Sequence, residues 1–100
     1  MISIVIPVFN QHEMTKECLQ SIRDNTRGYE VIFVDNGSKP PLAHTDGYSF
    51  DVDVRIIRNE ENKGFPAAVN QGIKAAKGDI IVLLNNDCIV TPHWSERLVS

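Results

Sequence analysis

The sequence predicts an α/β fold, an open and mainly parallel sheet of about four strands flanked by helices. Four short runs rich in Val and Ile alternate with helix-like or loop-like segments, and this alternation is typical of right-handed crossovers onto a parallel sheet. The last run, Ile80–Leu84, is apolar throughout, which is typical of a strand buried on both faces. One hundred residues suit one modest domain, so we expect a single unit over residues 1–100.

The chain begins with a strand and a helix. We expect the strand over Ile2–Pro7 and the helix over Asn10–Asn25. Asn10 can cap this helix, and Glu13 stands three residues further on, as in a capping box. Apolar residues recur at helical spacing, namely Met14, Cys18, Leu19 and Ile22.

The middle of the chain holds two more predicted strands, over Glu30–Asp35 and Val52–Ile57. The segment between them, Gly37–Phe50, contains Pro40 and Pro41 and has little helical periodicity. We therefore expect mostly loop there, with room for one short helical turn.

The last part of the chain adds a helix, a strand and the start of another helix. The helix spans Phe65–Ala76, with Pro66 at a first helical position and Gly78 closing it just after Lys77. The fourth strand follows at Asp79–Leu84. Beyond it, a helix that starts at Thr91 and Pro92 would place three apolar residues on one face, Trp94, Leu98 and Val99.

The composition is that of an ordinary globular protein and excludes several classes. Hydrophobic residues make up 42%, charged residues 23%, and the net charge is -3, which gives no basic footprint for nucleic acid. No apolar stretch approaches the roughly 20 residues that span a bilayer, and we expect a cytoplasmic protein. Cys18 and Cys88 are in no CxxC arrangement, so packing roles in a reducing compartment are expected rather than a disulfide.

Polar residues gather where each predicted strand ends. In a parallel sheet these carboxyl ends share one edge, where ligands bind. Each cluster alone also has a simpler interpretation as a turn or a helix entry loop, and it is their conjunction that favours a binding site. The clusters are Pro7–Asn10, Asp35–Ser38, Arg58–Gly64 and Asn85–Asp87.

The chemistry of these clusters suits a nucleoside diphosphate. The Asp35 carboxylate can accept an N–H of a nucleobase. Asp87, with an amide oxygen of Asn85 or Asn86 nearby, can hold Mg²⁺ or Mn²⁺, and such a cation neutralises a leaving diphosphate. The sequence has no GxxxxGK[ST] loop, and no GxGxxG follows the first strand, which disfavours kinase-like and dinucleotide-binding functions.

The chain resembles the amino-terminal half of a family 2 glycosyltransferase with the Rossmann-like GT-A fold. The resemblance implies that residues 1–100 are the nucleotide-sugar-binding half of an incomplete GT-A domain, truncated at its carboxyl terminus. Four segments carry it, in the family's order and spacing: Ser3–Asn10, Val31–Ser38, Asn62–Gly72 and Gly78–Asp87.

This resemblance implies an inverting, metal-dependent transfer of a sugar from a nucleotide-diphosphate sugar to an acceptor hydroxyl. The implied metal ligand is Asp87, in the segment where the family carries an Asp-x-Asp motif. Ala68, Asn70 and Gly72 would shape the helix behind the nucleotide. The implied nucleotide-binding residues are Pro7, Phe9 and Asn10 around the base and ribose, Asp35 and Asn36 at the base, Lys63 and Gly64 in the approaching loop, and Asn85 and Asn86 beside the metal.

Two departures from the family pattern limit what this chain can do. Asn85 stands where the family often has Asp, so it brings no charge. The family's catalytic base lies in the later half of the domain, and Glu96 is expected to face solvent on a helix, so no catalytic residue is assigned here. We expect a chain that binds the donor but is inactive alone. Polysaccharide, lipid-linked and protein acceptors stay open, as does the inner face of a membrane as the location of the full-length protein.

Two other functions fit parts of the same sequence pattern. A non-catalytic nucleotide-sugar or partner-binding module is compatible with the missing base and with Asn85. A phosphoacceptor receiver-like domain is disfavoured, because the first strand ends in Pro-Val-Phe-Asn rather than in acidic residues. The fourth strand would also leave an unfinished, apolar sheet edge, from which we expect homo-oligomers.

Overall fold

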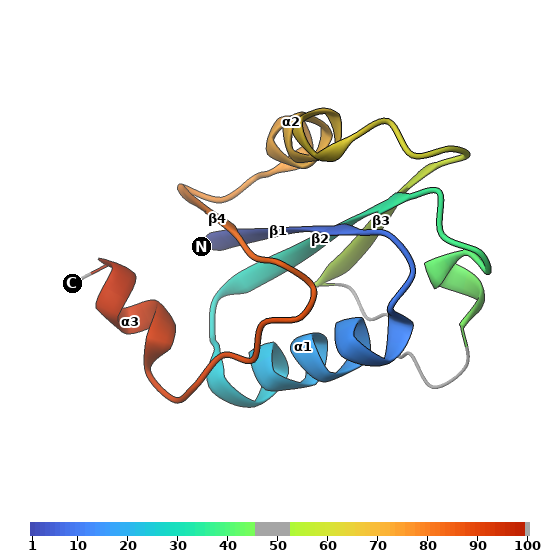
Figure 1. Ribbon diagram of the computed structural model, residues 1–100. Coiled ribbons are helices and arrows are strands. Elements are labelled where there is room, and N and C mark those ends of the chain that lie inside the picture. Colours follow the sequence, from blue (N-terminus) through green and yellow to red (C-terminus); the bar gives the residue numbers. More distant parts are fainter. Residues whose placement is uncertain (46–52, 100) are drawn as a thin grey trace.

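A computed structural model describes residues 1–45 and 53–99, with side chains up to residue 97 in the last helix. Its centre is a four-stranded parallel sheet in the order β3-β2-β1-β4. Helices α1 and α2 cover opposite faces of this sheet (Figure 1), and the α/β prediction is confirmed. The strands are β1 (Ile2–Val8), β2 (Tyr29–Asn36), β3 (Val54–Asn59) and β4 (Ile80–Leu83); the helices are α1 (His12–Asn25), α2 (Phe65–Ala75), α3 (Trp94–Val99) and a 3₁₀ turn, η1 (Leu42–His44).

The core has two layers because successive strand residues point to opposite faces of the sheet. On one face, Ile4 and Ile6 of β1 pack with Leu19 and Ile22 of α1, all almost fully buried. On the other face, the next residue of β1, Val5, packs in a smaller cluster with α2. The α2 layer is thin since small residues, not large ones, face the sheet.

The start of α1 differs from the prediction. The helix begins at His12, its N-cap is Gln11 in the left-handed region, and no side chain caps it. The Asn10 side-chain oxygen instead accepts the N–H of Lys39 at 2.9 Å, and the Asn10 N–H donates to Ser38 Oγ at 2.8 Å. The predicted capping box was wrong because the hydrogen bonds of Asn10 join the β1–α1 loop to the loop after β2.

Gly78 also has a role other than the predicted one. Helix α2 ends at Ala75, and Ala76 is extended. A Cβ on Gly78 would lie 2.6 Å from the Met1 carbonyl oxygen and 2.7 Å from Ser3 Oγ. This position therefore needs glycine so that the chain can pass close to β1, and not to end the helix.

Buried Glu30 fastens the α2–β4 connection to the sheet, at the end opposite the polar clusters. Its carboxylate accepts hydrogen bonds from Ser3 Oγ at 2.6 Å, from the Lys77 N–H at 2.7 Å and from Arg55 Nη2 at 2.9 Å. Burial alone would raise the pKa of Glu30, but these hydrogen bonds outweigh it and lower the pKa below its usual 4.5.

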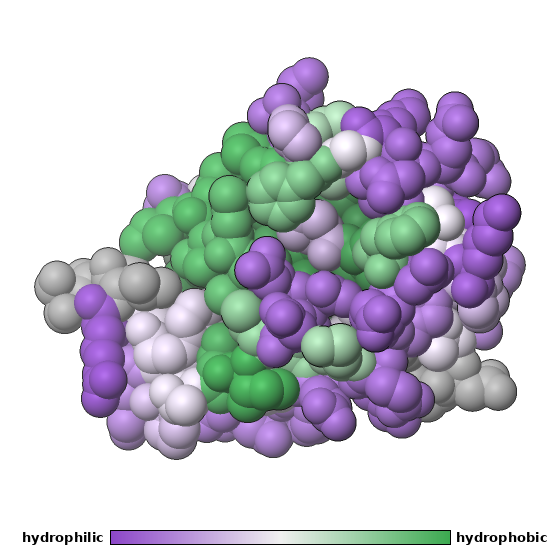
Figure 2. All heavy atoms as spheres, in the orientation of Figure 1, coloured by the Kyte–Doolittle hydropathy of each residue, from purple (hydrophilic) through white to green (hydrophobic). Residues whose placement is uncertain are grey.

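Strand β4 is not buried, and the prediction that both of its faces are covered was wrong. It lies at the edge of the sheet and pairs with β1, and the side chains of Ile81 and Leu83 are 41% and 47% exposed. Figure 2 shows apolar side chains gathered over β4 and beside α2. An apolar run is the same in a central strand and an edge strand, so the sequence pattern alone could not separate them.

The remaining predictions are partly confirmed. The turn η1 is the short helical turn expected within Gly37–Phe50, and β3 matches the third strand from Val54 onward; residues 46–52 lie outside the described chain. The Trp94 indole N–H donates to Thr26 Oγ1 at 2.7 Å, whereas the side chains of Leu98 and Val99 lie outside the description. No helix of the described residues has the length and apolarity needed to cross a bilayer.

Candidate functional site

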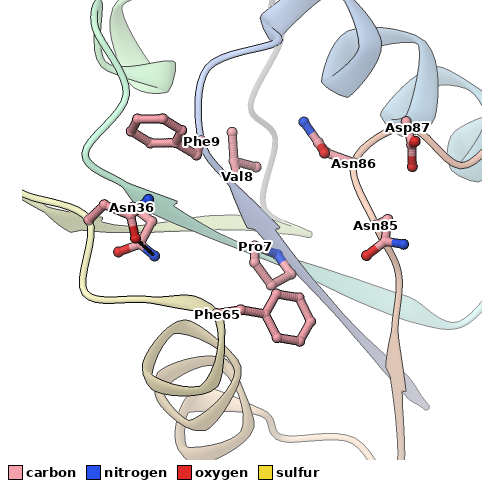
Figure 3. A pocket seen from close by; sticks show the side chains of 9 residues that line it. Pro7, Val8, Phe9, Asn36, Phe65, Asn85, Asn86 and Asp87 are labelled. Atoms are coloured by element: carbon pink, nitrogen blue, oxygen red, sulfur yellow. Dashed lines mark hydrogen bonds between the residues drawn. The ribbon is translucent and has the colours of Figure 1, made fainter.

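A cavity of about 310 Å³ lies at the carboxyl ends of β1, β2 and β4, where ligands bind in open α/β sheets. Figure 3 shows the rings of Phe9 and Phe65 on one side of it and the segment after β4 on the other. Its lining combines apolar rings, amides and one carboxylate: Pro7, Val8, Phe9, Asn36, Asn62, Phe65, Asn85, Asn86 and Asp87.

The cavity brings together a large part of the predicted site. Pro7, Phe9, Asn36, Asn85, Asn86 and Asp87 all line it, whereas Asn10, Asp35, Lys63 and Gly64 do not. Val8 and Asn62 lie in two of the predicted clusters but were not predicted as binding residues, and Phe65 lies outside the clusters. The available signal for Phe65 was an aromatic residue at the solvent-facing start of a helix, directly after a glycine, and its ring is 56% exposed.

Asp35 is fully buried and holds the turn after β2 together. One carboxylate oxygen accepts the Ser38 N–H at 3.0 Å, and the other accepts the Leu42 N–H at 2.8 Å and Arg58 Nη1 at 2.9 Å. Burial acts to raise the pKa of Asp35, but the hydrogen bonds from Ser38, Leu42 and Arg58 lower it overall. The carboxylate is therefore ionised and occupied, and it borders a separate cavity of about 390 Å³ beside η1.

Asn36, the next residue, points to the opposite face and positions the loop before α2. Its side-chain oxygen accepts the Lys63 N–H at 2.9 Å and Asn59 Nδ2 at 3.2 Å. Its side-chain nitrogen donates to Asn62 Oδ1 at 2.9 Å and to the Gly64 carbonyl at 3.1 Å. The Asn36 amide thus holds the loop that brings Asn62 and Phe65 to one side of the cavity.

Gly37 allows this loop to approach β2. Its φ of +87° lies in the left-handed region, and a Cβ there would come within 2.9 Å of backbone atoms of Glu61 and Asn62. A side chain at residue 37 would therefore be strained twice, by its backbone angle and by the neighbouring loop. Together, Asn36 and Gly37 explain how the Asp-Asn-Gly-Ser turn supports the cavity without Asp35 lining it.

The polar corner of the cavity follows β4. The Asn85 carbonyl accepts the Cys88 N–H at 3.1 Å, which closes a turn around Asn86 and Asp87. The thiol of Cys18 lies beneath, 3.9 Å from the same carbonyl. Burial, then the nearby Cys88 and Asp87, raises the pKa of Cys18 to about 12, so it is a neutral packing group. Both cysteines are free thiols in the structure.

The donor set of this corner fits a cation that is shared with a ligand. Asp87 is exposed and offers a carboxylate, and Asn85 and Asn86 offer amide oxygens beside it. In the described part of the chain, no three His, Cys, Asp or Glu side chains are grouped to hold a metal by themselves. Mg²⁺ commonly takes one or two carboxylates and completes its shell with water and phosphate oxygens, which is the kind of site these residues can form.

Comparison with known families identifies the chain. Residues 3–100 match the model of glycosyl transferase family 2. The chain belongs to this family. The family 2 assignment agrees with the resemblance seen in the sequence and covers all four of the polar clusters.

Curated relatives of the family 2 chain are also glycosyltransferases. It is 35% identical over 105 residues to glycosyltransferase AglE of Haloferax volcanii, covering 99% of this chain and 34% of that protein. It is 34% identical over 101 residues to glycosyltransferase GlyG of Streptococcus pneumoniae, covering 98% and 34% respectively. The chain therefore spans about a third of the length of these relatives.

Solved structures share the GT-A-like fold. TarS 1–349 of S. aureus superposes with a TM-score of 0.84 at 21% identity, over 98% of this chain and 31% of that one. The mannosyltransferase PcManGT of Pyrobaculum calidifontis, in a complex with GDP-Man and Mn²⁺, superposes with a TM-score of 0.69 at 23% identity, over 86% and 27%. These likenesses establish the fold of the family 2 chain.

Proposed function

We propose that this chain is the donor-binding part of an inverting glycosyltransferase, which transfers a sugar from a nucleotide-diphosphate sugar to an acceptor hydroxyl. The observation that carries the proposal is the cavity at the carboxyl ends of β1, β2 and β4, where aromatic rings, amides and Asp87 converge. The family assignment supports the reaction class, and the neighbouring mannosyltransferase bound to GDP-Man supports the donor class.

The apolar side of the cavity suits the nucleoside. Phe9 and Phe65 are 50% and 56% exposed although both are large and apolar, and aromatic faces exposed in a cavity bind bases by stacking. Asn36 also lines the cavity, but its amide already makes four hydrogen bonds within the protein, so its proposed part is to hold the loop that forms this side of the cavity. Asn10, Asp35, Lys63 and Gly64 lie outside this lining, and the nucleotide contacts predicted for them stay predictions.

The polar corner suits the diphosphate and a divalent cation, Mn²⁺ or Mg²⁺. Asp87 would be the carboxylate ligand, and Asn85 and Asn86 would contribute amide oxygens or bind phosphate. When bound, the cation would neutralise charge on the departing diphosphate. The complex of PcManGT with GDP-Man and Mn²⁺ supports the proposal of a divalent cation at this corner.

We propose that the 100 residues bind the donor without turning it over. The cavity lining contains one carboxylate, Asp87, which is assigned to the cation and not to an acceptor proton. The acceptor is a polysaccharide, a lipid-linked molecule or a protein. A cytoplasmic location, or the inner face of a membrane for the full-length protein, stays a prediction that cell fractionation can test.

Thermal unfolding with nucleoside diphosphates tests donor binding. A ligand at about 100 times its dissociation constant stabilises by about 2.7 kcal/mol, which raises the melting temperature of a domain of this size by roughly 4–8 °C per kcal/mol. We expect UDP or GDP with Mn²⁺ to give such a shift and Asp87→Ala to reduce it. Glu17→Ala, at an exposed carboxylate of α1, is the matched control and should leave the shift unchanged.

The alternative is a non-catalytic nucleotide-sugar or partner-binding module, and turnover separates the two. A longer version of the chain that includes the rest of the transferase domain should release nucleoside diphosphate in the presence of an acceptor. Asp87→Ala should abolish that release. Nucleotide binding without turnover in the longer chain would favour the module instead.

A further inference from the structure

Thr15 is a buried polar residue on α1 that lies outside the cavity lining. It is 0% exposed, and a hydroxyl removed from water in this way needs hydrogen-bond partners. Both of its partners are defined in the structure. One is the carbonyl of Gln11 at the start of α1, and the other is the side chain of Asn86, 71 residues along the chain.

The directions of these two hydrogen bonds are fixed by the single proton of the hydroxyl. Thr15 Oγ1 donates that proton to the Gln11 carbonyl at 3.2 Å, and a carbonyl can only accept. Oγ1 must therefore accept from Asn86, whose Nδ2 lies 3.0 Å away. With the amide turned round, the hydroxyl would have to give its proton to Asn86 and lose its bond to the Gln11 carbonyl, so the observed orientation keeps one more hydrogen bond.

This arrangement decides which atom Asn86 presents to the cavity. With Nδ2 held by α1, the amide oxygen is the end left for a ligand, and among the described residues it accepts no hydrogen bond. Asn86 and Asp87 both line the cavity, and Figure 3 shows them side by side after β4. An oxygen beside a carboxylate is a suitable ligand for a hard cation or its bound water.

We propose that Thr15 is a positioning residue, which holds Asn86 with its amide oxygen toward the cation and diphosphate corner. The inference rests on the proposed function, since it concerns the same site, but it assigns part of the cation affinity to a residue of α1 that touches no ligand. Partners that orient a metal's ligands typically account for a factor of about 10–100 in metal affinity.

The test separates positioning from a merely structural role. The quantity to measure is the cation-dependent gain, which is the dissociation constant of GDP or UDP with EDTA divided by that with Mn²⁺, obtained by titration calorimetry on the full chain. We expect Thr15→Val, which keeps the shape but lacks the hydroxyl, to lower this gain about tenfold. Thr15→Ser keeps the hydroxyl and should retain the gain. A structural role would lower the melting temperature and leave the gain unchanged.

A second variant keeps the proposal testable if Thr15→Val fails to fold. Asn86→Ala, at a partly exposed position, should lower the gain as much as Thr15→Val does. In the Asn86→Ala background, Thr15→Val should have no further effect on the gain, since the two residues act as one unit. Unchanged gain in Asn86→Ala, or additive effects of the two substitutions, would overturn the proposal.

The outcomes for the unsubstituted chain distinguish this proposal from the function on which it rests. If the chain binds neither GDP nor UDP, the proposed function is refuted, and the positioning role of Thr15 is refuted as well. If it binds a nucleotide equally well with EDTA and with Mn²⁺, the nucleotide site stands and the positioning role is refuted.

Discussion

Replacing Gly72 with alanine should push α2 away from the sheet, although alanine is the better helix former. A Cβ on Gly72 would lie 2.2 Å from Cγ1 of Val5 and 3.2 Å from its Cβ and Cγ2. Carbon atoms pack at about 3.5–4.0 Å, so α2 must move by roughly 1.3–1.8 Å, because Val5 is fully buried in the central strand and cannot retreat.

The two effects have opposite signs, and their magnitudes decide the result. Gly to Ala in a helix interior favours the helix by about 1 kcal/mol, whereas overpacking a buried contact costs about 1–3 kcal/mol. The clash at Gly72 is far shorter than a contact distance, which puts it at the upper end of that range. We therefore expect Gly72→Ala to destabilise by about 1–2 kcal/mol net.

Urea unfolding of a double-mutant cycle checks this reasoning. Val5→Ala removes the methyl groups that the new Cβ would meet, so it should be less damaging in the Gly72→Ala background than alone, with a coupling of about 1 kcal/mol or more. Asn70→Ala, at an exposed position of the same helix, is the matched control and should change little. A Gly72→Ala chain that is more stable than the original would refute the reasoning, since helix propensity would then have decided the outcome.

Three further predictions concern the loop before α2, the pH dependence of stability and the exposed edge of the sheet. Asn36→Leu removes all four hydrogen bonds of the amide, so it should weaken GDP or UDP binding in calorimetry and increase amide hydrogen exchange at Lys63 and Gly64. Unchanged exchange would contradict the role of Asn36 in holding the loop before α2. Because the folded pKa of Glu30 lies below its usual 4.5, the unfolded chain takes up that proton first as the pH falls; stability should be full above pH 4.5 and decrease on acidification, and Glu30→Gln should flatten the decrease in urea titrations at several pH values. The exposed β4 edge should give dimers in sedimentation velocity at tens of micromolar, the rough range of weak pairing, and Ile81→Lys should remove them; a monomer throughout would contradict edge pairing.

The fold was predictable because it depends on patterns that lie in short stretches of sequence. Apolar runs that alternate with segments of helical spacing predict parallel strands and crossover helices, whatever the position of each strand in the sheet. The exposure of Ile81 and Leu83 depends instead on the order of the strands in space, which places β4 at the edge. No local pattern contains that order.

The sequence predicts the location of the candidate site better than it predicts the individual contacts of its residues. Asp35 and Asn36 are consecutive in β2, so only one of them can face the cavity, and the sequence does not say which. In the structure Asn36 faces the cavity, and Asp35 instead accepts hydrogen bonds from Arg58 and from the Leu42 N–H. Thr15 had no signal at all, since its contact with Asn86 joins residues far apart in the chain.

Direct titration of the chain with GDP and with UDP tests the central proposal most directly. We expect saturable binding of one of them to a single site, tighter with Mn²⁺ than with EDTA. Asp87→Ala should reduce the affinity with Mn²⁺ toward the value found with EDTA, while Glu17→Ala should not. Absence of binding by either nucleotide, with or without Mn²⁺, in a chain shown to be folded would contradict a nucleotide-diphosphate site at the end of β4.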